Sequence, residues 1–332
     1  MREFFDLSVT QREQAIRATA VRKGIDPFMI EKDFWVVLVL DLLFSKSSIG
    51  KHFSFKGGTS LSKAYNAIER FSEDIDLILD WRVLGYAKNE PWLERSKNQQ
   101  NKFNLEINSK TKEYIERVII PELNKLSKNY GITNIEFVIN ENDGMTIDVS
   151  YPMLFASTYT LQTIRLEIGP LAAWTPSSEM EITPYVFEEF PQVFSNAKIF
   201  VPTVEAKRTF WEKAVILHRE ANRSKPTGYR YSRHYYDLFM MSKSHIKNEA
   251  LTDLQLLSDV VNFNIKFYPI GDAKFEEAYP GAFRIIPSKE QISILRKDYA
   301  DMKDMFFDEP VEFDVIVEEL EMLEFEINQL SH

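Results

Sequence analysis

Two short stretches, FKGGTS at residues 55–60 and RFSEDIDL at residues 70–77, indicate how the middle of this chain folds. The first is typical of the end of a strand, a pair of glycines and the start of a helix. In the second, Asp74 and Asp76 stand two residues apart among apolar residues. Side chains alternate between the faces of a strand, so a strand here would carry both carboxylates on one face. A pair of glycines or an Asp-x-Asp pattern is weak evidence by itself. The combined order of strand, glycine turn, helix and acidic strand is a much more specific pattern.

The same block carries the chemistry that the sequence suggests. Two glycines before a helix let backbone N–H groups approach a phosphate, so Gly57 and Gly58, with the hydroxyls of Thr59 and Ser60, are candidate phosphate ligands. Two neighbouring carboxylates repel each other unless a cation lies between them, and Mg²⁺ or Mn²⁺ with oxygen ligands meets that need. A helix cap followed by a solvent-facing strand would explain either half by itself.

The residues around this block predict a small mixed sheet flanked by helices, an α+β fold. Residues 8–46 have the spacing of helices interrupted between Gly24 and Pro27, and residues 102–128 that of a helix which Pro121 should kink or divide. A shorter helix is predicted at residues 59–69. Strands are predicted at residues 52–56, 74–79, 134–139, 145–151 and 163–168.

The second half of the chain predicts mostly helices. A stretch with five prolines and little periodicity, residues 170–202, separates the two halves and is the best candidate for a domain boundary. We therefore expect one domain over residues 1–200, with the sheet and the N-terminal helices, and a mostly helical domain over residues 201–332. The helices of the second domain are predicted at residues 204–220, 232–244, 248–267, 288–305 and 311–330.

Composition and charge restrict the class of protein. The chain has 332 residues, 44% of them hydrophobic and 27% charged, which is ordinary for a globular protein. A net charge of −10 argues against a general nucleic-acid coat. The charge is uneven, because residues 205–234 contain eight Lys or Arg against three Glu, whereas residues 301–332 contain eleven Asp or Glu against one Lys. A basic middle and an acidic end can coexist with one anionic substrate.

Several other classes of protein are disfavoured. The chain has no cysteine, which excludes disulfides and thiolate metal sites and fits a reducing cytoplasm. Its five histidines lack the spacing of a zinc site. Asp41 interrupts the long apolar stretch at residues 34–44, which is shorter than the roughly 20 residues of a membrane span. The N-terminus does not resemble a signal peptide. We expect a cytoplasmic protein with no membrane partner.

The glycine turn and acidic strand together resemble the first motif of the polymerase-β-like nucleotidyltransferase superfamily. More closely, the chain is similar to the AbiEii/AbiGii abortive-infection toxins of bacteria. The similarity runs in the right order through nearly the whole chain. It includes EKDFW at residues 31–35, RTFWEK at residues 208–213, RHYYDL at residues 233–238 and DYADM at residues 298–302.

This resemblance implies roles for four residues. Asp74 and Asp76 would be the catalytic carboxylates that hold the metals. Lys213 would contact the nucleotide phosphates, a suitable task for a point charge. Asp237 would be an essential acid of uncertain role. Without the family, Lys213 reads as a solvated helix lysine, and Asp237 as the partner of Arg233 in an i,i+4 salt bridge.

A third metal carboxylate is expected from a later strand. Asp148 and Glu167 both alternate with apolar residues, and the family pattern favours Glu167. Its neighbour Arg165 would lie on the same face and place a cation near a site that handles both metal and phosphate. Either residue would otherwise be an exposed strand residue.

The resemblance implies a transferase that moves a nucleoside monophosphate from a nucleoside triphosphate to an acceptor and releases pyrophosphate. The acceptor could be RNA, such as the 3′ end of a tRNA. The protein would be the toxin of a toxin–antitoxin system that acts in phage defence, with a cognate antitoxin protein as a possible partner. Two alternatives remain open: a phosphotransferase acting on a protein or small molecule, and a catalytically inactive nucleotide-binding regulator.

Overall fold

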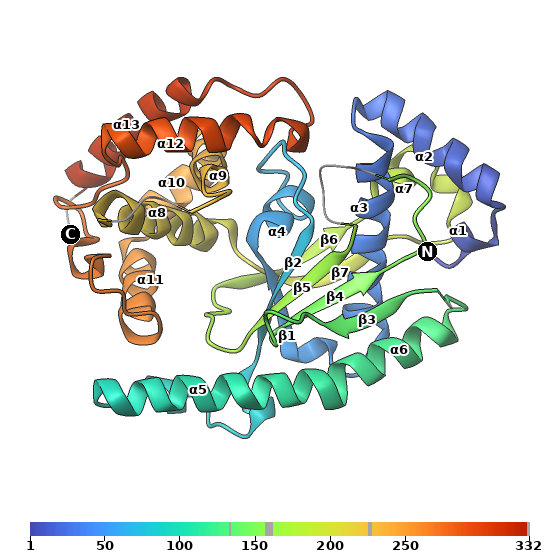
Figure 1. Cartoon of the computed structure of the whole chain (residues 1–332), viewed down its shortest axis with the longest axis horizontal. Helices are drawn as coiled ribbons and strands as arrows, with labels where there is room; N and C mark the ends of the chain where they lie inside the picture. Colours follow the sequence, from blue (N-terminus) through green and yellow to red (C-terminus); the bar gives the residue numbers. More distant parts are fainter. Residues whose placement is uncertain (133, 157–161, 225–227, 331–332) are drawn as a thin grey trace. The chain divides into compact units, whose positions relative to one another are not determined.

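The structure, a computed structural model, describes residues 1–132, 134–156, 162–224 and 228–330 (Figure 1). The chain divides into two compact units. Unit 1 comprises Met1–Ala64 and Phe71–Val204, and unit 2 comprises Tyr65–Arg70 and Glu205–His332. The sequence predicts a boundary after residue 200, four residues before this division. It does not predict that six residues between the glycine turn and the acidic strand belong to unit 2.

Unit 1 is built on one mixed sheet of seven strands in the order β3-β4-β5-β2-β1-β7-β6. Strand β2 lies in the middle, parallel to β5 and antiparallel to β1, and β1 is parallel to β7. The predicted α+β class with a mixed sheet is therefore confirmed. The strands are β1 Phe53–Lys56, β2 Asp74–Leu79, β3 Glu136–Ile139, β4 Thr146–Ser150, β5 Ile164–Gly169, β6 Ser177–Ile182 and β7 Ile199–Val204.

The proline-spaced stretch at residues 170–202, which the sequence marks as the best candidate for a domain boundary, lies within unit 1. It forms β6, the short helix α7 (Tyr185–Glu189) and β7, which extend the sheet of unit 1. Proline is tolerated where an element begins, because the N–H group that it lacks is not needed there. Pro176 directly precedes β6 and Pro184 directly precedes α7. These prolines mark where β6 and α7 begin. Because both elements are short, their sequences show little periodicity.

The N-terminal helices follow local signals closely. Helix α1 (Glu3–Asp6) is followed by α2 (Val9–Lys23), which begins with a capping box at Ser8 and ends at Gly24 in the left-handed conformation. Helix α3 (Pro27–Leu40) begins with Asp26 as its cap and continues as a π-helical turn over Asp41–Lys46. The predicted interruption between Gly24 and Pro27 is confirmed. Every residue of α3 after Pro27 is buried, so this helix passes through the interior of unit 1.

The other helices of unit 1 depart from the predictions at their ends. Helix α4 (Gly57–Lys63) is shorter than predicted, because the backbone of the following residues bonds within unit 2, where Phe307 donates to the carbonyl of Glu69. Helices α5 (Lys97–Tyr114) and α6 (Ile120–Asn129) form one long rod, joined by a π-helical segment just before Pro121 (Figure 1). Proline thus marks the start of α6 without breaking the rod.

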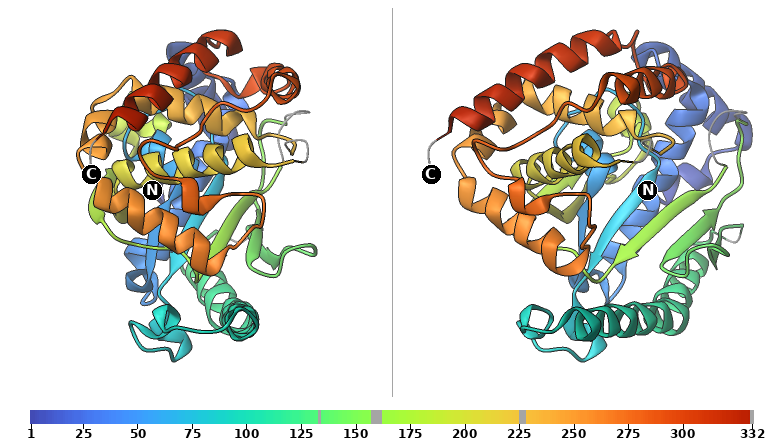
Figure 2. Two further views of the ribbon diagram at one scale, coloured as in Figure 1. Left: turned by 90° about the vertical axis from the view of Figure 1, so that its left-hand side faces the viewer. Right: turned by 60° about the vertical axis from the view of Figure 1, so that its left-hand side comes forward.

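Unit 2 is mostly helical, as predicted (Figure 2). Helix α8 packs against three of the others, α9, α10 and α11. The helix predicted at residues 248–267 is two helices, because Asp253 caps the start of the second one. Within the described residues, no helix is long and apolar enough to cross a membrane. The helices are α8 Ala206–Asn222, α9 Ser232–Ser242, α10 His245–Leu251, α11 Leu254–Phe267, α12 Lys289–Ala300 and α13 Phe313–Gln329.

Candidate active site

Strand β2 carries the two aspartates on one face at the centre of the sheet. Asp74 and Asp76 are half-buried, whereas Ile75 and Leu77 between and after them are buried in the core. In the strand pairing, Asp76 stands beside Glu167 of the neighbouring strand β5. Paired residues on adjacent strands point to the same face, so Asp74, Asp76 and Glu167 share it.

This face also carries cations, and we call it the polar sheet face. Lys56 of β1 pairs with Asp76, and Arg165 of β5 pairs with Asp74 on one side and with Asp148 of β4 on the other. Alternating carboxylates and cations suit a surface that handles both a metal ion and phosphate groups. The polar sheet face comprises Lys56, Asp74, Asp76, Asp148, Arg165 and Glu167.

The glycine turn and the acidic strand fit against each other at a single position. Gly57 has φ +79°, and a Cβ atom built on it would lie 1.8 Å from Oδ2 of Asp76. Any other residue would therefore be strained in its backbone and would collide with this carboxylate. The sequence suggests Gly57 as a phosphate ligand. The structure adds a second requirement, because the glycine leaves the space that the Asp76 carboxylate occupies.

The hydroxyl groups after the glycines are directed into the fold. Thr59 donates a hydrogen bond to the carbonyl oxygen of Asp74, and Ser60 donates to that of Gly57 at 2.8 Å. Both side chains are buried, as is Gly58. In this structure the Thr59 hydroxyl holds the turn against β2, whereas the Ser60 hydroxyl bonds within the turn itself. Their role as phosphate ligands remains a prediction, as does that of Gly58.

The two candidates for the third carboxylate have different surroundings. Glu167 is exposed and lies on the strand next to Asp76. Asp148 lies one strand further away, 3.5 Å from Nε of Arg165, and it accepts a 2.7 Å hydrogen bond from Asn140. Because Glu167 stands directly beside Asp76 and Asp148 does not, the register favours Glu167.

The chemistry of the donor set fits a hard divalent cation, because Asp74, Asp76 and Glu167 all offer carboxylate oxygens. The side chains are not gathered as metal ligands in this structure. Among the described residues, no three acidic or histidine side chains converge as they would around an ion. The structure therefore supplies a suitable face and suitable donors, and the metal site itself remains a prediction.

The other two predicted residues, Lys213 and Asp237, lie in unit 2. Together with the buried Arg70 and the half-buried His234 they form a group that we call the Asp237 cluster. Arg70 holds Asp237 with two bonds, Nε–Oδ1 at 2.7 Å and Nη2–Oδ2 at 2.9 Å. Nζ of Lys213 lies 2.8 Å from Oδ2 of Asp237 and 3.0 Å from Nδ1 of His234. Asp237 therefore pairs with Arg70 and Lys213. It does not form the i,i+4 salt bridge with Arg233 that the sequence offers as an alternative. Lys213 is not a solvated lysine either, since it is only 7% exposed.

The charges of the Asp237 cluster are set by burial and by one another. Burial by itself would raise the pKa of Asp237, but the charges of Arg70 and Lys213 outweigh it and hold this pKa well below its usual range. Burial lowers the pKa of Lys213, and the Asp237 carboxylate opposes that effect. Burial and the nearby Lys213 charge lower the pKa of His234 well below normal. A neutral His234 then accepts a hydrogen bond from the Lys213 ammonium through Nδ1.

The basic segment at residues 205–234 is more internally paired than its charge suggests. Arg219 and Arg223 both form ion pairs with the buried Glu220, and Lys207 pairs with Asp253. Lys225 lies outside the described residues. Much of this positive charge is therefore neutralised within unit 2.

Sequence reasoning missed several residues that hold these groups in place. Arg70 stands inside the quoted RFSEDIDL stretch, but nothing in the sequence indicates that it pairs with Asp237. Asp298, from the DYADM stretch, accepts hydrogen bonds from the backbone N–H (2.8 Å) and the hydroxyl (2.6 Å) of Ser232. Ser232 begins helix α9, which carries His234 and Asp237. The similarity of these stretches to the family was the only signal that could have found them.

The mixed sheet, the carboxylates of β2 and the adjoining glycine turn agree with the class of nucleotidyltransferases, and the comparisons with known proteins establish that class. Residues 39–319 match the family model described as "Nucleotidyl transferase AbiEii toxin, Type IV TA system". The chain belongs to this family of toxins from Type IV toxin–antitoxin systems.

Two further comparisons add less. No curated protein sequence matches the chain significantly. Among solved structures, the chain is similar to MenT4, a nucleotidyltransferase toxin from Mycobacterium tuberculosis, with a TM-score of 0.43 and 16% sequence identity. That match covers 95% of this chain and 96% of the other.

Proposed function

We propose that this toxin is a metal-dependent enzyme that transfers a nucleoside monophosphate from a nucleoside triphosphate to an RNA acceptor, such as the 3′ end of a tRNA. The observation that carries this proposal is the strand register, which puts Asp74, Asp76 and Glu167 on one face. The fit of Gly57 against Asp76 ties the glycine turn to that face. Membership of the nucleotidyltransferase family supplies the reaction class.

Asp74 and Asp76 would hold Mg²⁺ or Mn²⁺, with Glu167 as the third ligand. The bound cation would neutralise charge on the triphosphate and make the acceptor hydroxyl more acidic. The chain's own contribution is to orient the carboxylates. Strand β2 fixes their spacing, the glycine turn gives Asp76 its place, and Lys56 and Arg165 add positive charge along the same face.

The family resemblance implies nucleotide contacts for the backbone N–H groups of Gly57 and Gly58 in unit 1 and, separately, for Lys213 in unit 2. Lys213 already has two partners, Asp237 and His234. A phosphate group would have to share Lys213 with them, or displace one of them. Because the cluster holds two cations and one carboxylate, it retains a net positive charge that favours an anion.

Membership of the family supports a proposal about the biological setting. A toxin of a toxin–antitoxin system acts inside the cell that makes it and has an antitoxin as counterpart. We place its action in the cytoplasm, where tRNA and nucleoside triphosphates are both present. A role in defence against phage is part of the same proposal.

Labelled nucleotides test the reaction. The protein is incubated with total bacterial RNA, Mg²⁺ and nucleoside triphosphates labelled at the α or the γ phosphate. Label that enters RNA only from the α position supports nucleotide transfer. Label transferred only from the γ position would show a phosphotransferase, and none from either would favour a nucleotide-binding regulator. Sequencing the 3′ ends of cellular RNA after induced expression then identifies the acceptor and the added nucleotide.

A further inference from the structure

Helix α3 carries three consecutive charged residues through the interior of unit 1. Glu31, Lys32 and Asp33 are 2%, 0% and 2% exposed. Burying a charged side chain is unfavourable unless it is paired and hydrogen-bonded. Successive residues of a helix point about 100° apart, so the three side chains must find three different partners. The partners of Glu31, Lys32 and Asp33 indicate which segments these residues hold in place.

Lys32 contacts the residue just before the acidic strand. Its Nζ lies 2.7 Å from Oε2 of Glu73, and both side chains are buried. Glu73 directly precedes Asp74, the first residue of β2. This ion pair therefore fixes the point at which the acidic strand begins.

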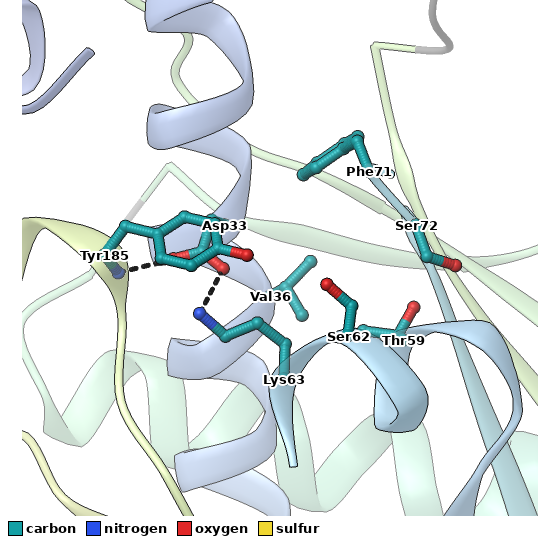
Figure 3. A pocket seen from close by; sticks show the side chains of 8 residues that line it. All are labelled: Asp33, Val36, Thr59, Ser62, Lys63, Phe71, Ser72 and Tyr185. Atoms are coloured by element: carbon teal, nitrogen blue, oxygen red, sulfur yellow. Dashed lines mark hydrogen bonds and ion pairs between the residues drawn. The ribbon is translucent and has the colours of Figure 1, made fainter. Parts of the chain in front are cut away.

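Asp33 contacts the far end of the glycine-turn helix. Its Oδ1 lies 2.7 Å from Nζ of Lys63, the last residue of α4, and its Oδ2 accepts a 2.7 Å hydrogen bond from the backbone N–H of Tyr185 (Figure 3). The Lys63 ammonium also lies 3.6 Å from the centre of the Tyr185 ring. This ion pair therefore fixes the end of α4.

The cavity beside this second pair is too small for a nucleotide. Asp33, Lys63, Thr59 and Tyr185 are among its lining residues, and its volume is about 10 Å³ (Figure 3). That is room for one water molecule at most. The Asp33–Lys63 pair is therefore a contact that holds the fold and not a site for substrate.

The two segments held by α3 are the two that must fit each other at the carboxylates. Thr59 of α4 bonds to the carbonyl of Asp74, and the Asp76 carboxylate occupies the space left by Gly57. A shift of either α4 or β2 would disturb both contacts. Helix α3 thus contacts both segments. Lys32 binds Glu73 just before β2, Asp33 binds Lys63 at the end of α4, and α4 and β2 also contact each other directly.

We propose that Lys32 and Asp33 are positioning residues that set the place of the metal-binding carboxylates Asp74 and Asp76. They act through Glu73 and Lys63 and do not touch the substrate. This inference rests on the proposed function, because the exact place of the carboxylates matters only if they bind a metal. Both residues belong to the EKDFW stretch at residues 31–35, which the family resemblance includes without assigning it a role.

Two paired variants test the proposal. Lys32→Met with Glu73→Gln removes both charges of the first pair, and Asp33→Asn with Lys63→Met removes both charges of the second, so that neither leaves a lone buried charge. Glu31→Gln is the matched control. Glu31 is equally buried on the same helix, but it binds the backbone N–H groups of Leu154 and Phe155 at 2.8 and 2.9 Å.

Mn²⁺ binding is measured by calorimetry on the intact protein, together with the Mg²⁺ dependence of nucleotide transfer and the melting temperature. Both paired variants should bind Mn²⁺ about tenfold more weakly, the usual effect of losing a residue that orients metal ligands. The Mg²⁺ concentration for half-maximal activity should rise in parallel, with a smaller change in KM for the nucleotide. Glu31→Gln should keep the metal affinity of the wild type even if it melts earlier.

Wild-type Mn²⁺ affinity in the paired variants would overturn the proposal, because the residues would then serve stability alone. Asp33→Glu covers the case in which the paired variants do not fold. It keeps the charge but displaces the carboxylate by one methylene group, so unchanged metal affinity in this variant would also overturn the proposal. Asp76→Asn distinguishes a failure of the proposed function from a failure of the positioning role alone. If the wild type shows no Mn²⁺ site that Asp76→Asn removes, the proposed function and the positioning role both fail. If that site exists but the variants leave it intact, only the positioning role fails.

Discussion

The polar sheet face and the Asp237 cluster both contain aspartates that the family resemblance marks as important, yet their surroundings are opposite. Asp74 and Asp76 are half-buried, with a third carboxylate, Glu167, on the next strand. Asp237 is fully buried between Arg70 and Lys213. Three carboxylates that share one partly open face offer the oxygen ligands that a hard divalent cation prefers. A carboxylate enclosed by two cations is already neutralised, so Asp237 acts by holding Arg70 and Lys213 in place.

The sharpest test of this comparison is the stability of two alanine variants. Asp237→Ala leaves two cations without their buried partner and should lower the free energy of unfolding by about 3–5 kcal/mol. Asp76→Ala removes a carboxylate that is only half-buried and should change the free energy of unfolding by less than about 1 kcal/mol. Urea denaturation of both variants measures the difference. Similar losses in the two would show that the aspartates have similar structural roles.

Asp76→Ala, which should hardly change stability, should have a large effect on activity. Asp76→Ala should lower nucleotide transfer by at least about a hundredfold, since losing a metal ligand removes about 3 kcal/mol or more of transition-state stabilisation. It should also relieve the growth arrest expected when the wild-type toxin is induced in bacteria. The measurements are turnover of the folded variant and growth after induction. Growth arrest as strong as that of the wild type would separate toxicity from the carboxylates of β2.

The polar sheet face can be divided further by two isosteric variants. Glu167→Gln should lose activity by about tenfold or more, because Glu167 stands beside Asp76 in the strand register. Asp148→Asn should keep most of its activity, because Asp148 lies one strand further away and is held by Arg165 and Asn140. Mg²⁺-dependent transfer by the two folded variants decides between them. An active Glu167→Gln with an inactive Asp148→Asn would move the third ligand to β4.

The smallest expected effect is the pH dependence of stability from His234. Its pKa is lowered in the folded protein, so it stays neutral there but takes up a proton in the unfolded chain below about pH 6.5. The unfolded state then binds more protons, and stability falls as the pH falls. The contribution is at most about 1.4 kcal/mol for each pH unit below 6.5.

Comparing His234→Gln with the wild type isolates this contribution. Between pH 7 and pH 5.5 the variant should lose less of its free energy of unfolding, as measured with urea. His218, whose pKa burial also lowers, is present in both proteins and cancels in the comparison. Equal losses would mean that His234 is not held neutral by the cluster.

Much of the fold could be predicted because its signals are local. Ser8, Gly24 and Asp26 mark the ends of α2 and α3 through hydrogen bonds to their near neighbours in sequence. The alternation around Asp74 and Asp76 gave β2 its limits and its polar face. The same alternation around Glu167 gave β5, although the place of β5 beside β2 could not be predicted from it.

The sequence by itself therefore determined most of the helices, the acidic strand, the glycine turn and the family, because periodicity, capping and short motifs depend on residues close together in the chain. Tertiary structure alone decided which charges meet. Arg70 and Asp237 are 167 residues apart, and Lys32 and Glu73 are 41 apart. It also decided that α4 ends at Lys63 and that a proline-spaced stretch completes the sheet. These features arise when distant segments pack together and bury their charges, and burial makes each charge depend on a partner that no local pattern reveals.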